Sequence, residues 1–113
     1  MSFQLPNLQA KITNLATDLK LAPGEQVTFE EMRTSVLAVA FRVESTGNLL
    51  LYVEQFSDSE WTLADKTACY KGTTLWQCML KKPLFRVRLK NVTQSPVTIT
   101  VDVNMFEKVA GQQ

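Results

Sequence analysis

The residues in this chain best suited to chemistry are two cysteines and two short groups of carboxylates, because the sequence contains no histidine. Without histidine there is no imidazole to act as a general base, to activate a serine or cysteine, or to ligate a metal. The carboxylates Glu30–Glu31 and Asp58/Glu60 could still perform acid–base catalysis as pairs. Both groups lie where turns or strand ends are expected, so we interpret them as solvated surface charges. We therefore expect no catalytic residues, no cofactor and no enzyme activity.

Cys69 and Cys78 flank a predicted turn. A four-residue loop from Gly72 to Leu75 would set the two cysteines directly opposite each other on paired strands, where a disulfide is geometrically feasible. A loop centre shifted by one residue would separate them diagonally. Two cysteines without a secretion signal favour buried free thiols. Two cysteines in a chain without histidine cannot build a closed zinc site, so we expect no bound metal.

Length and composition exclude several classes of protein. At 113 residues and 45% hydrophobic content the chain is one domain that can bury its own core. A net charge of +1 argues against a nucleic-acid partner, because phosphate neutralisation needs a basic excess. No apolar run approaches the roughly 20 residues needed to span a bilayer. Met1–Pro6 show no secretion signal, and the glycosylation sequon at Asn91–Thr93 would matter only in a secretory route.

The strongest structural signal is strict alternation of apolar and polar residues, which predicts half-buried antiparallel strands. It is clearest in residues 84–93 and 96–106. With turn residues at about ten-residue spacing, it predicts seven strands, at residues 26–29, 36–44, 49–56, 61–70, 75–80, 84–93 and 96–106. This pattern is typical of an all-β fold, an antiparallel β-sandwich of jelly-roll type with about seven to eight strands. We assign residues 23–109 to this domain and residues 110–113 to a frayed tail.

Neighbouring strands in the sequence are predicted to pair as hairpins. Residues 36–44 and 49–56 form one such pair around the turn at residues 45–48. A turn centred on Gln94 would pair the last two strands, with Leu89 opposite Ile99. Small residues on the outer face of the 36–44 strand, Ala38 and Ala40, indicate that something packs closely over part of that surface.

The N-terminal segment shows a different period. Leu8, Ile12, Leu15 and Leu19 are spaced four, three and four residues apart, which would place them on one face of a helix. Residues 1–22 therefore form a predicted N-terminal unit, a short amphipathic helix or an extended arm. It could lie on the sandwich of its own chain, or its four apolar residues could dock on a neighbouring subunit.

A row of cations, Arg86, Arg88 and Lys90, lies along one predicted strand face. It could bind phosphate, an acidic polysaccharide or an acidic partner protein. The alternative, which we favour, is a solvated sheet face, partly neutralised by Asp102 across the predicted hairpin, whose charges discourage unwanted sheet pairing.

Aromatic residues raise the possibility of a sugar-binding surface. Trp61, Tyr70 and Trp76 could stack on sugar rings, since aromatic faces serve carbohydrate-binding sandwiches well. We favour packing in the core or at its rim instead, because no three aromatics are spaced to share one strand face.

Two stretches, read together, resemble a known module. Residues 48–61 contain a strand, a Ser-Asp loop and a strand that begins with Trp. Residues 85–93, followed by strand residues 98–103, resemble an aromatic-x-Val-Arg-Val-x-Asn-x-Thr signature. In this order they resemble the small β-sandwich, jelly-roll-like module of structural proteins of phages and large double-stranded DNA viruses. The resemblance covers residues 36–106 and departs at Ser59–Glu60, where the usual module has Gly-Thr or Asn-Gly.

The resemblance implies a virion structural protein: a minor capsid, vertex (penton) or cement protein that acts through protein–protein contacts. Its implied partners are other capsid or virion proteins, in a homo-oligomer or a larger assembly, and its implied location is the virion, assembled in the host cytoplasm. The resemblance carries no catalytic residues. The alternative function is a carbohydrate-binding β-sandwich module that uses Trp61, Tyr70 and Trp76.

Overall fold

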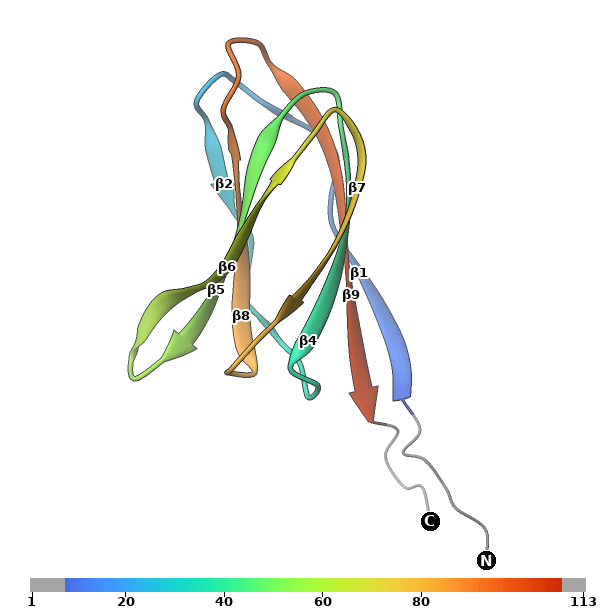
Figure 1. Cartoon of the computed structure of the whole chain (residues 1–113), viewed down its shortest axis with the longest axis vertical. Coiled ribbons are helices and arrows are strands. Elements are labelled where there is room, and N and C mark those ends of the chain that lie inside the picture. The colour runs from blue at the N-terminus through green and yellow to red at the C-terminus, as the bar shows by residue number, and fades with distance from the viewer. Residues whose placement is uncertain (1–7, 109–113) are drawn as a thin grey trace, which may run out of the picture.

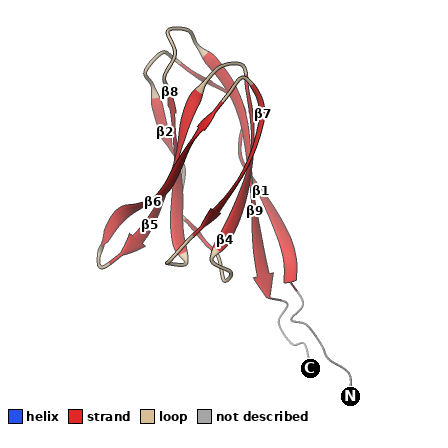
Figure 2. Cartoon of the chain, in the orientation of Figure 1, coloured by secondary structure: helices blue, strands red, loops and turns tan. Residues whose placement is uncertain are grey.

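The computed structural model describes residues 8–108, which fold into two stacked antiparallel sheets without a helix (Figures 1 and 2). Sheet A contains four strands in the order β1–β9–β4–β7, namely β1 (Leu8–Leu21), β9 (Val97–Lys108), β4 (Ala38–Ser45) and β7 (Gly72–Met79). Sheet B contains five strands in the order β2–β8–β5–β6 with β3 also paired to β8, namely β2 (Gln26–Thr28), β3 (Met32–Arg33), β5 (Leu49–Ser57), β6 (Glu60–Cys69) and β8 (Leu84–Asn91). Within residues 8–108 no helix could cross a membrane.

The strand order is that of a jelly roll, which confirms the predicted fold. The chain changes sheets at nearly every connection, and β2 and β3 together occupy one strand position beside β8. Of the strands within residues 8–108, β5 and β6 are the only two that follow each other in the sequence and also pair with each other. They form a hairpin that projects from the sandwich (Figure 1). Its turn residues, Asp58 and Ser59, have φ values of 53° and 69°. Positive φ at both central positions is typical of the type I′ turn, whose twist matches that of the flanking strands.

The core lies between the sheets and follows the alternation in the sequence. On β8 the inward side chains are fully buried and the outward ones are half-buried. The same alternation orders the inner face of β4. The buried apolar side chains are Leu21, Val39, Phe41, Val43, Leu49, Leu51, Val53, Cys69, Cys78, Leu80, Phe85, Val87, Leu89, Val97, Ile99, Val101, Val103 and Met105. This one layer holds the two sheets together.

The predicted hairpin between the last two strands is wrong. Strand β8 lies in sheet B and β9 lies in sheet A, so Leu89 and Ile99 face the core from opposite sheets. Leu89 is paired instead with Leu51 on β5, and Ile99 with Ser45 on β4. Alternation predicts which face of a strand is buried. It does not distinguish two strands paired in one sheet from two strands that face each other across the core, because either arrangement buries the apolar face. The proposed pairing of Arg86 with Asp102 fails for the same reason.

The other predicted pairings also cross between sheets. Strands β4 and β5 belong to different sheets, as do β6 and β7, so neither pair forms a hairpin. Cys69 is therefore paired with Leu49 on β5, and Cys78 with Val39 on β4. The two cysteines therefore lie neither directly opposite nor diagonally across one pair of strands, as the two predicted registers required. Both are buried free thiols, in agreement with the expectation.

Of the two forms expected for the N-terminal unit, a helix or an extended arm, the helix is not formed: residues 8–21 are extended as strand β1 and pair along β9. Two irregularities, between Asn14 and Ala16 and between Ala16 and Leu19, reset which side of β1 faces the core. These irregularities give the apolar residues their helix-like spacing. The long pairing with β9 outweighs that local pattern. The sandwich thus includes residues that we had assigned to the separate unit 1–22, while residues 1–7 and the predicted tail 110–113 lie outside the described range.

Asn91 forms hydrogen bonds with both connections at one end of the sandwich, the one between β1 and β2 and the one between β8 and β9. It is fully buried, and its side-chain nitrogen donates to three backbone carbonyl oxygens at 2.8–3.2 Å, those of Leu21, Ala22 and Ser95. Its side-chain oxygen accepts from the backbone nitrogen of Thr93 at 2.9 Å and from the Thr93 hydroxyl at 2.8 Å. Every hydrogen-bonding position of the amide is therefore occupied. In the folded chain the sequon asparagine is a structural residue, inaccessible to a glycan.

We predict that Asn91→Ala lowers the free energy of unfolding by about 2–4 kcal/mol, because it leaves the buried carbonyl group of Leu21 and several part-buried backbone groups without partners. Urea unfolding followed by circular dichroism would measure the loss. Gln94→Ala is the matched control, since Gln94 is exposed in the same connection and should change stability by less than about 0.5 kcal/mol. Equal stability of the two variants would contradict the role given to Asn91.

The buried thiols make stability depend on alkaline pH. Burial raises the pKa of Cys69 from 9.0 to about 11, against a smaller lowering by a hydrogen bond with Thr74. Burial also raises the pKa of Cys78 to about 11, and the charge of Asp65 adds to the rise. Between these values the unfolded chain loses thiol protons that the folded chain keeps. The thiol contribution to stability is therefore intact below pH 9.0 and is lost as pH rises toward about 11.

We predict that the free energy of unfolding declines between pH 9.0 and about 11, and that Cys69→Ala/Cys78→Ala reduces the decline. The two proteins share every other titratable group, so the difference in slope between them isolates the thiols. Urea unfolding across this range provides the measurement. Parallel curves for the two proteins would show that the thiols do not contribute.

Candidate functional site

The predicted cationic row lies on the outer face of sheet B, where its two arginines form ion pairs within the chain. Arg86 Nε lies 2.8 Å from Oε1 of Glu54, and Arg88 Nη2 lies 3.7 Å from its Oε2. Glu54 is directly opposite Arg86 in the register of β5 and β8, and its side chain is only 15% exposed. One carboxylate thus bridges two guanidinium groups, as cross-strand charge pairs do in stable sheets.

Aromatic rings cover the same two arginines. The guanidinium carbon of Arg86 lies 4.3 Å from the centre of a Trp61 ring, and that of Arg88 lies 4.0 Å from the centre of the Tyr52 ring. Arg88 also donates to Oε1 of Gln26 at 3.2 Å. The arginine side chains are only 31% and 24% exposed. An acidic ligand would therefore have to displace existing contacts to reach them, and the row is better explained as packing within sheet B.

The third cation of the row, Lys90, is half-buried on β8 and lies opposite Leu50 on one side and Gln26 on the other. These neighbours carry no charge.

The three candidate sugar-stacking residues lie in different places. Trp61 packs edge-on against Phe56 in the projecting hairpin, with ring centres 5.3 Å apart. Tyr70 lies just beyond β6 and is 65% exposed. Trp76 faces inward on β7 and stacks on Phe41, with ring centres 5.8 Å apart. They therefore form no shared platform.

The apolar residues predicted to share a helix face are divided by strand β1. Ile12 points outward and is 70% exposed. Leu15 and Leu19 are partly buried and pack against the core. The backbone of Leu8 lies opposite Lys108, and its side chain lies outside the described atoms. Only Ile12 is thus seen to be available to a neighbouring molecule.

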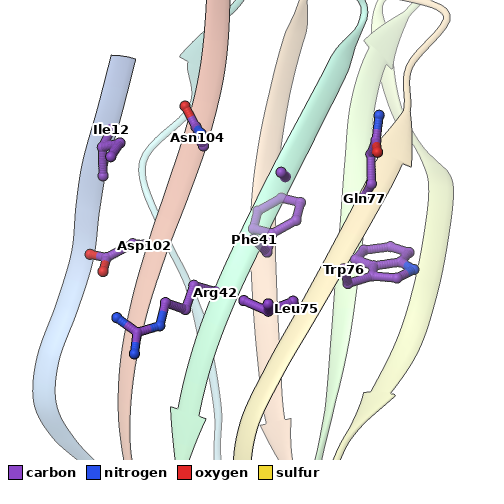
Figure 3. Close-up of a pocket in the computed structure, with 9 residues that line it drawn as sticks. Ile12, Phe41, Arg42, Leu75, Trp76, Gln77, Asp102 and Asn104 are labelled. Atoms are coloured by element: carbon purple, nitrogen blue, oxygen red, sulfur yellow. The ribbon is translucent and has the colours of Figure 1, made fainter. Parts of the chain in front are cut away.

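The most distinctive exposed surface is the outer face of sheet A, which contains a shallow hollow of about 550 Å³. Residues from all four strands of the sheet line it (Figure 3). Ala40 on β4 forms its floor between Asn104 on β9 and Gln77 on β7. Exposed apolar side chains stand on both edge strands, Ile12 on β1 and Leu75 on β7, the latter 74% exposed. We call this surface the sheet A trough, defined by Ile12, Ala40, Arg42, Leu75, Gln77, Asp102 and Asn104.

The charges of the trough lie on its two central strands. Arg42 on β4 and Asp102 on β9 are direct register partners. Each is held by a different neighbour, because Arg42 Nη2 lies 2.7 Å from Oε1 of Glu44 and Asp102 Oδ1 accepts from Asn14 Nδ2 at 2.9 Å. The Arg42 side chain is 58% exposed, so its charge remains accessible to another molecule.

One polar atom in the trough lacks a partner. Oδ1 of Asn104 is buried, and no donor within residues 8–108 lies at hydrogen-bonding distance from it. A buried acceptor without a partner is costly, and a donor on an incoming surface would relieve that cost. Small, polar and apolar residues lie together in the trough, as they do in protein–protein interfaces.

Sequence reasoning found only part of this surface. Ala38 and Ala40 had indicated close packing over the outer face of their strand, and the trough lies there. The sequence predicts a strand that contains Leu75 and Met79. It does not indicate which face of that strand is exposed, because the strand carries apolar residues on both faces. Among residues 8–108 no three Cys, Asp or Glu side chains are grouped to hold a metal ion.

No protein-family model and no curated protein matches this sequence. Several solved structures share its fold. The PBSX exported protein XepA is 18% identical with a TM-score of 0.67, over 93% of this chain and 39% of that chain. The Yersinia pseudotuberculosis-derived mitogen is 11% identical with a TM-score of 0.55, over 96% and 91%. PirA is 9% identical with a TM-score of 0.52, over 85% and 93%.

These similarities describe the fold and not the activity, because each identity is below one residue in five. The chain spans well under half the length of XepA. Together with the strand order, the comparisons show an antiparallel β-sandwich that other proteins also use.

Proposed function

We propose that this chain is a structural protein of a phage or viral particle, a minor capsid, vertex or cement component that acts through contacts with other proteins. The observation that carries the proposal is the uncovered outer face of sheet A, where Ile12, Leu75 and Met79 are 69–74% exposed. Single exposed apolar residues are ordinary on monomers. Here they stand beside the small floor residue Ala40 and a buried acceptor without a partner among residues 8–108, a combination that fits burial against another protein.

The fold supports this proposal without deciding it. Jelly rolls are used in viral capsids and also in lectins, so the strand order alone favours neither. The fold of the PBSX exported protein XepA is similar to that of this chain. The dispersed positions of Trp61, Tyr70 and Trp76 give the lectin-like alternative no binding surface. We propose accordingly that the chain is not an enzyme, that its partners are virion proteins and that it resides in the particle.

Quantitative mass spectrometry of gradient-purified particles tests the proposed function. We predict that the chain is present at a fixed copy number per particle. We also predict that Leu75→Ser/Met79→Ser reduces its amount in the particle at least about tenfold, because a loss of about 1.4 kcal/mol in contact energy already has that effect.

Leu63→Ser is the matched control, since Leu63 is 51% exposed on sheet B and its loss should leave incorporation unchanged. Thermal unfolding of both variants would confirm that they fold. Absence of the chain from purified particles would refute the proposed function. Equal incorporation of both variants would show that the outer face of sheet A is not the contact surface.

A further inference from the structure

The two central strands of sheet A carry outer faces that are complementary to each other. The register pairs Asn104 on β9 with Ala40 on β4, and Asp102 with Arg42. The same register continued by one residue sets Phe106 beside Ala38. At these three levels β9 presents Phe106, Asn104 and Asp102, where β4 presents two small residues and a basic one.

A two-fold axis parallel to the strands, placed between β9 and β4, turns this complementarity into a contact. Such an axis lays β9 of one copy over β4 of the other at the same level. Phe106 then covers Ala38 of the second copy, and Asp102 meets Arg42 of the second copy. By symmetry each contact occurs twice, as an isologous interface requires.

We propose that the outer face of sheet A binds a second copy of this chain, face to face, about a two-fold axis that runs along β9 and β4. Two sheets packed in this way keep their strands nearly aligned, the common geometry of sheet-on-sheet packing. This inference rests on the proposed function, because it names the partner that binds the contact surface described there.

The edge strands extend the contact. The axis places β1 of one copy over β7 of the other, so that Ile12 lies above Gln77 of the second copy, between the exposed Leu75 and Met79. The apolar side chains at the two edges of one face thus become buried by those at the edges of the other. Asn14 and Leu75 meet at the next level.

The size of the face is sufficient for association. Four strands about 4.8 Å apart, over eight residues that each rise about 3.3 Å, give a flat footprint of roughly 500 Å² per copy. The total of about 1,000 Å² reaches the minimum expected of a biological interface, even before the uneven surface of the side chains is counted. The affinity depends on the contacts made within this area rather than on the area itself.

The outer face of sheet B lacks these properties. Its arginines are neutralised by Glu54 within the same chain, and their guanidinium groups are covered by Trp61 and Tyr52. Arg42 of sheet A is also paired with a carboxylate of its own chain, Glu44, but its side chain is 58% exposed, against 31% and 24% for Arg86 and Arg88, so it remains accessible to a second copy. The two faces of the sandwich therefore differ in what they can bind.

Charge reversal at the symmetric pair tests the inference. We predict that the wild-type chain dimerises in sedimentation equilibrium, and that Arg42→Asp or Asp102→Arg alone weakens the dimer at least about tenfold by placing like charges together at both sites. An equimolar mixture of the two variants should recover the affinity, because the acidic side chain introduced on one copy then meets the basic side chain introduced on the other. Native mass spectrometry, with one variant carrying a mass tag, would identify the mixed dimer.

Recovery on mixing separates the contact between copies from effects within one chain, since mixing cannot repair the folding of either variant. Lys66→Asp is the matched control, an equal charge reversal on the exposed face of sheet B, and should dimerise as the wild type does. The inference is overturned if the wild-type chain stays monomeric, if the single variants dimerise normally, or if the mixture fails to recover. If a monomeric wild type still enters particles through Leu75 and Met79, another particle protein covers this face and the proposed function stands.

Discussion

A single layer of apolar side chains between the two sheets is the constraint on which the rest of the molecule depends. Because the inward positions of β4, β5, β8 and β9 are buried, only the outward positions can differ in role. Sheet B uses its outward positions for its own stability, with Glu54 bridging Arg86 and Arg88. Sheet A leaves Ile12 and Leu75 uncovered and the Oδ1 atom of Asn104 without a donor among residues 8–108. The surface that the chain does not satisfy by itself is therefore the surface that another protein can use.

The alternation in the sequence predicted the strands and their buried faces, but not their partners. Val87 and Ile99 are correctly placed in the core, yet they reach it from opposite sheets. A connection of five residues, 92–96, fits a hairpin as well as a crossing, so its length could not distinguish them. The structure distinguishes them through Asn91, whose buried amide binds the backbone of both connections at this end. That role depends on contacts between distant segments, which strand periodicity does not encode.

The candidate site was predictable only in part, for a related reason. Ala38 and Ala40 signalled a closely packed outer surface, since small residues on an exposed strand face invite another layer. Ile12 and Leu75 could not be joined to them, because their strands lie at opposite edges of the sheet and are far apart in the sequence. Ile12 was further obscured by the irregularities of β1, which imitate a helical period over residues 8–19. Patterns within a strand can therefore predict a face, whereas a surface that spans four strands requires the topology.

The pairing of β1 with β9 alone also has a consequence for biosynthesis. During translation, at roughly 5–20 residues per second, β1 leaves the ribosome before every other strand described here, yet its sole partner is the last of them to be made. The β5–β6 hairpin can form locally on the nascent chain, whereas sheet A has to wait for its central strand β9. A polypeptide whose synthesis stops early thus lacks both that strand and the completed outer surface. The order of the strands thereby makes the outer face of sheet A depend on the synthesis of β9.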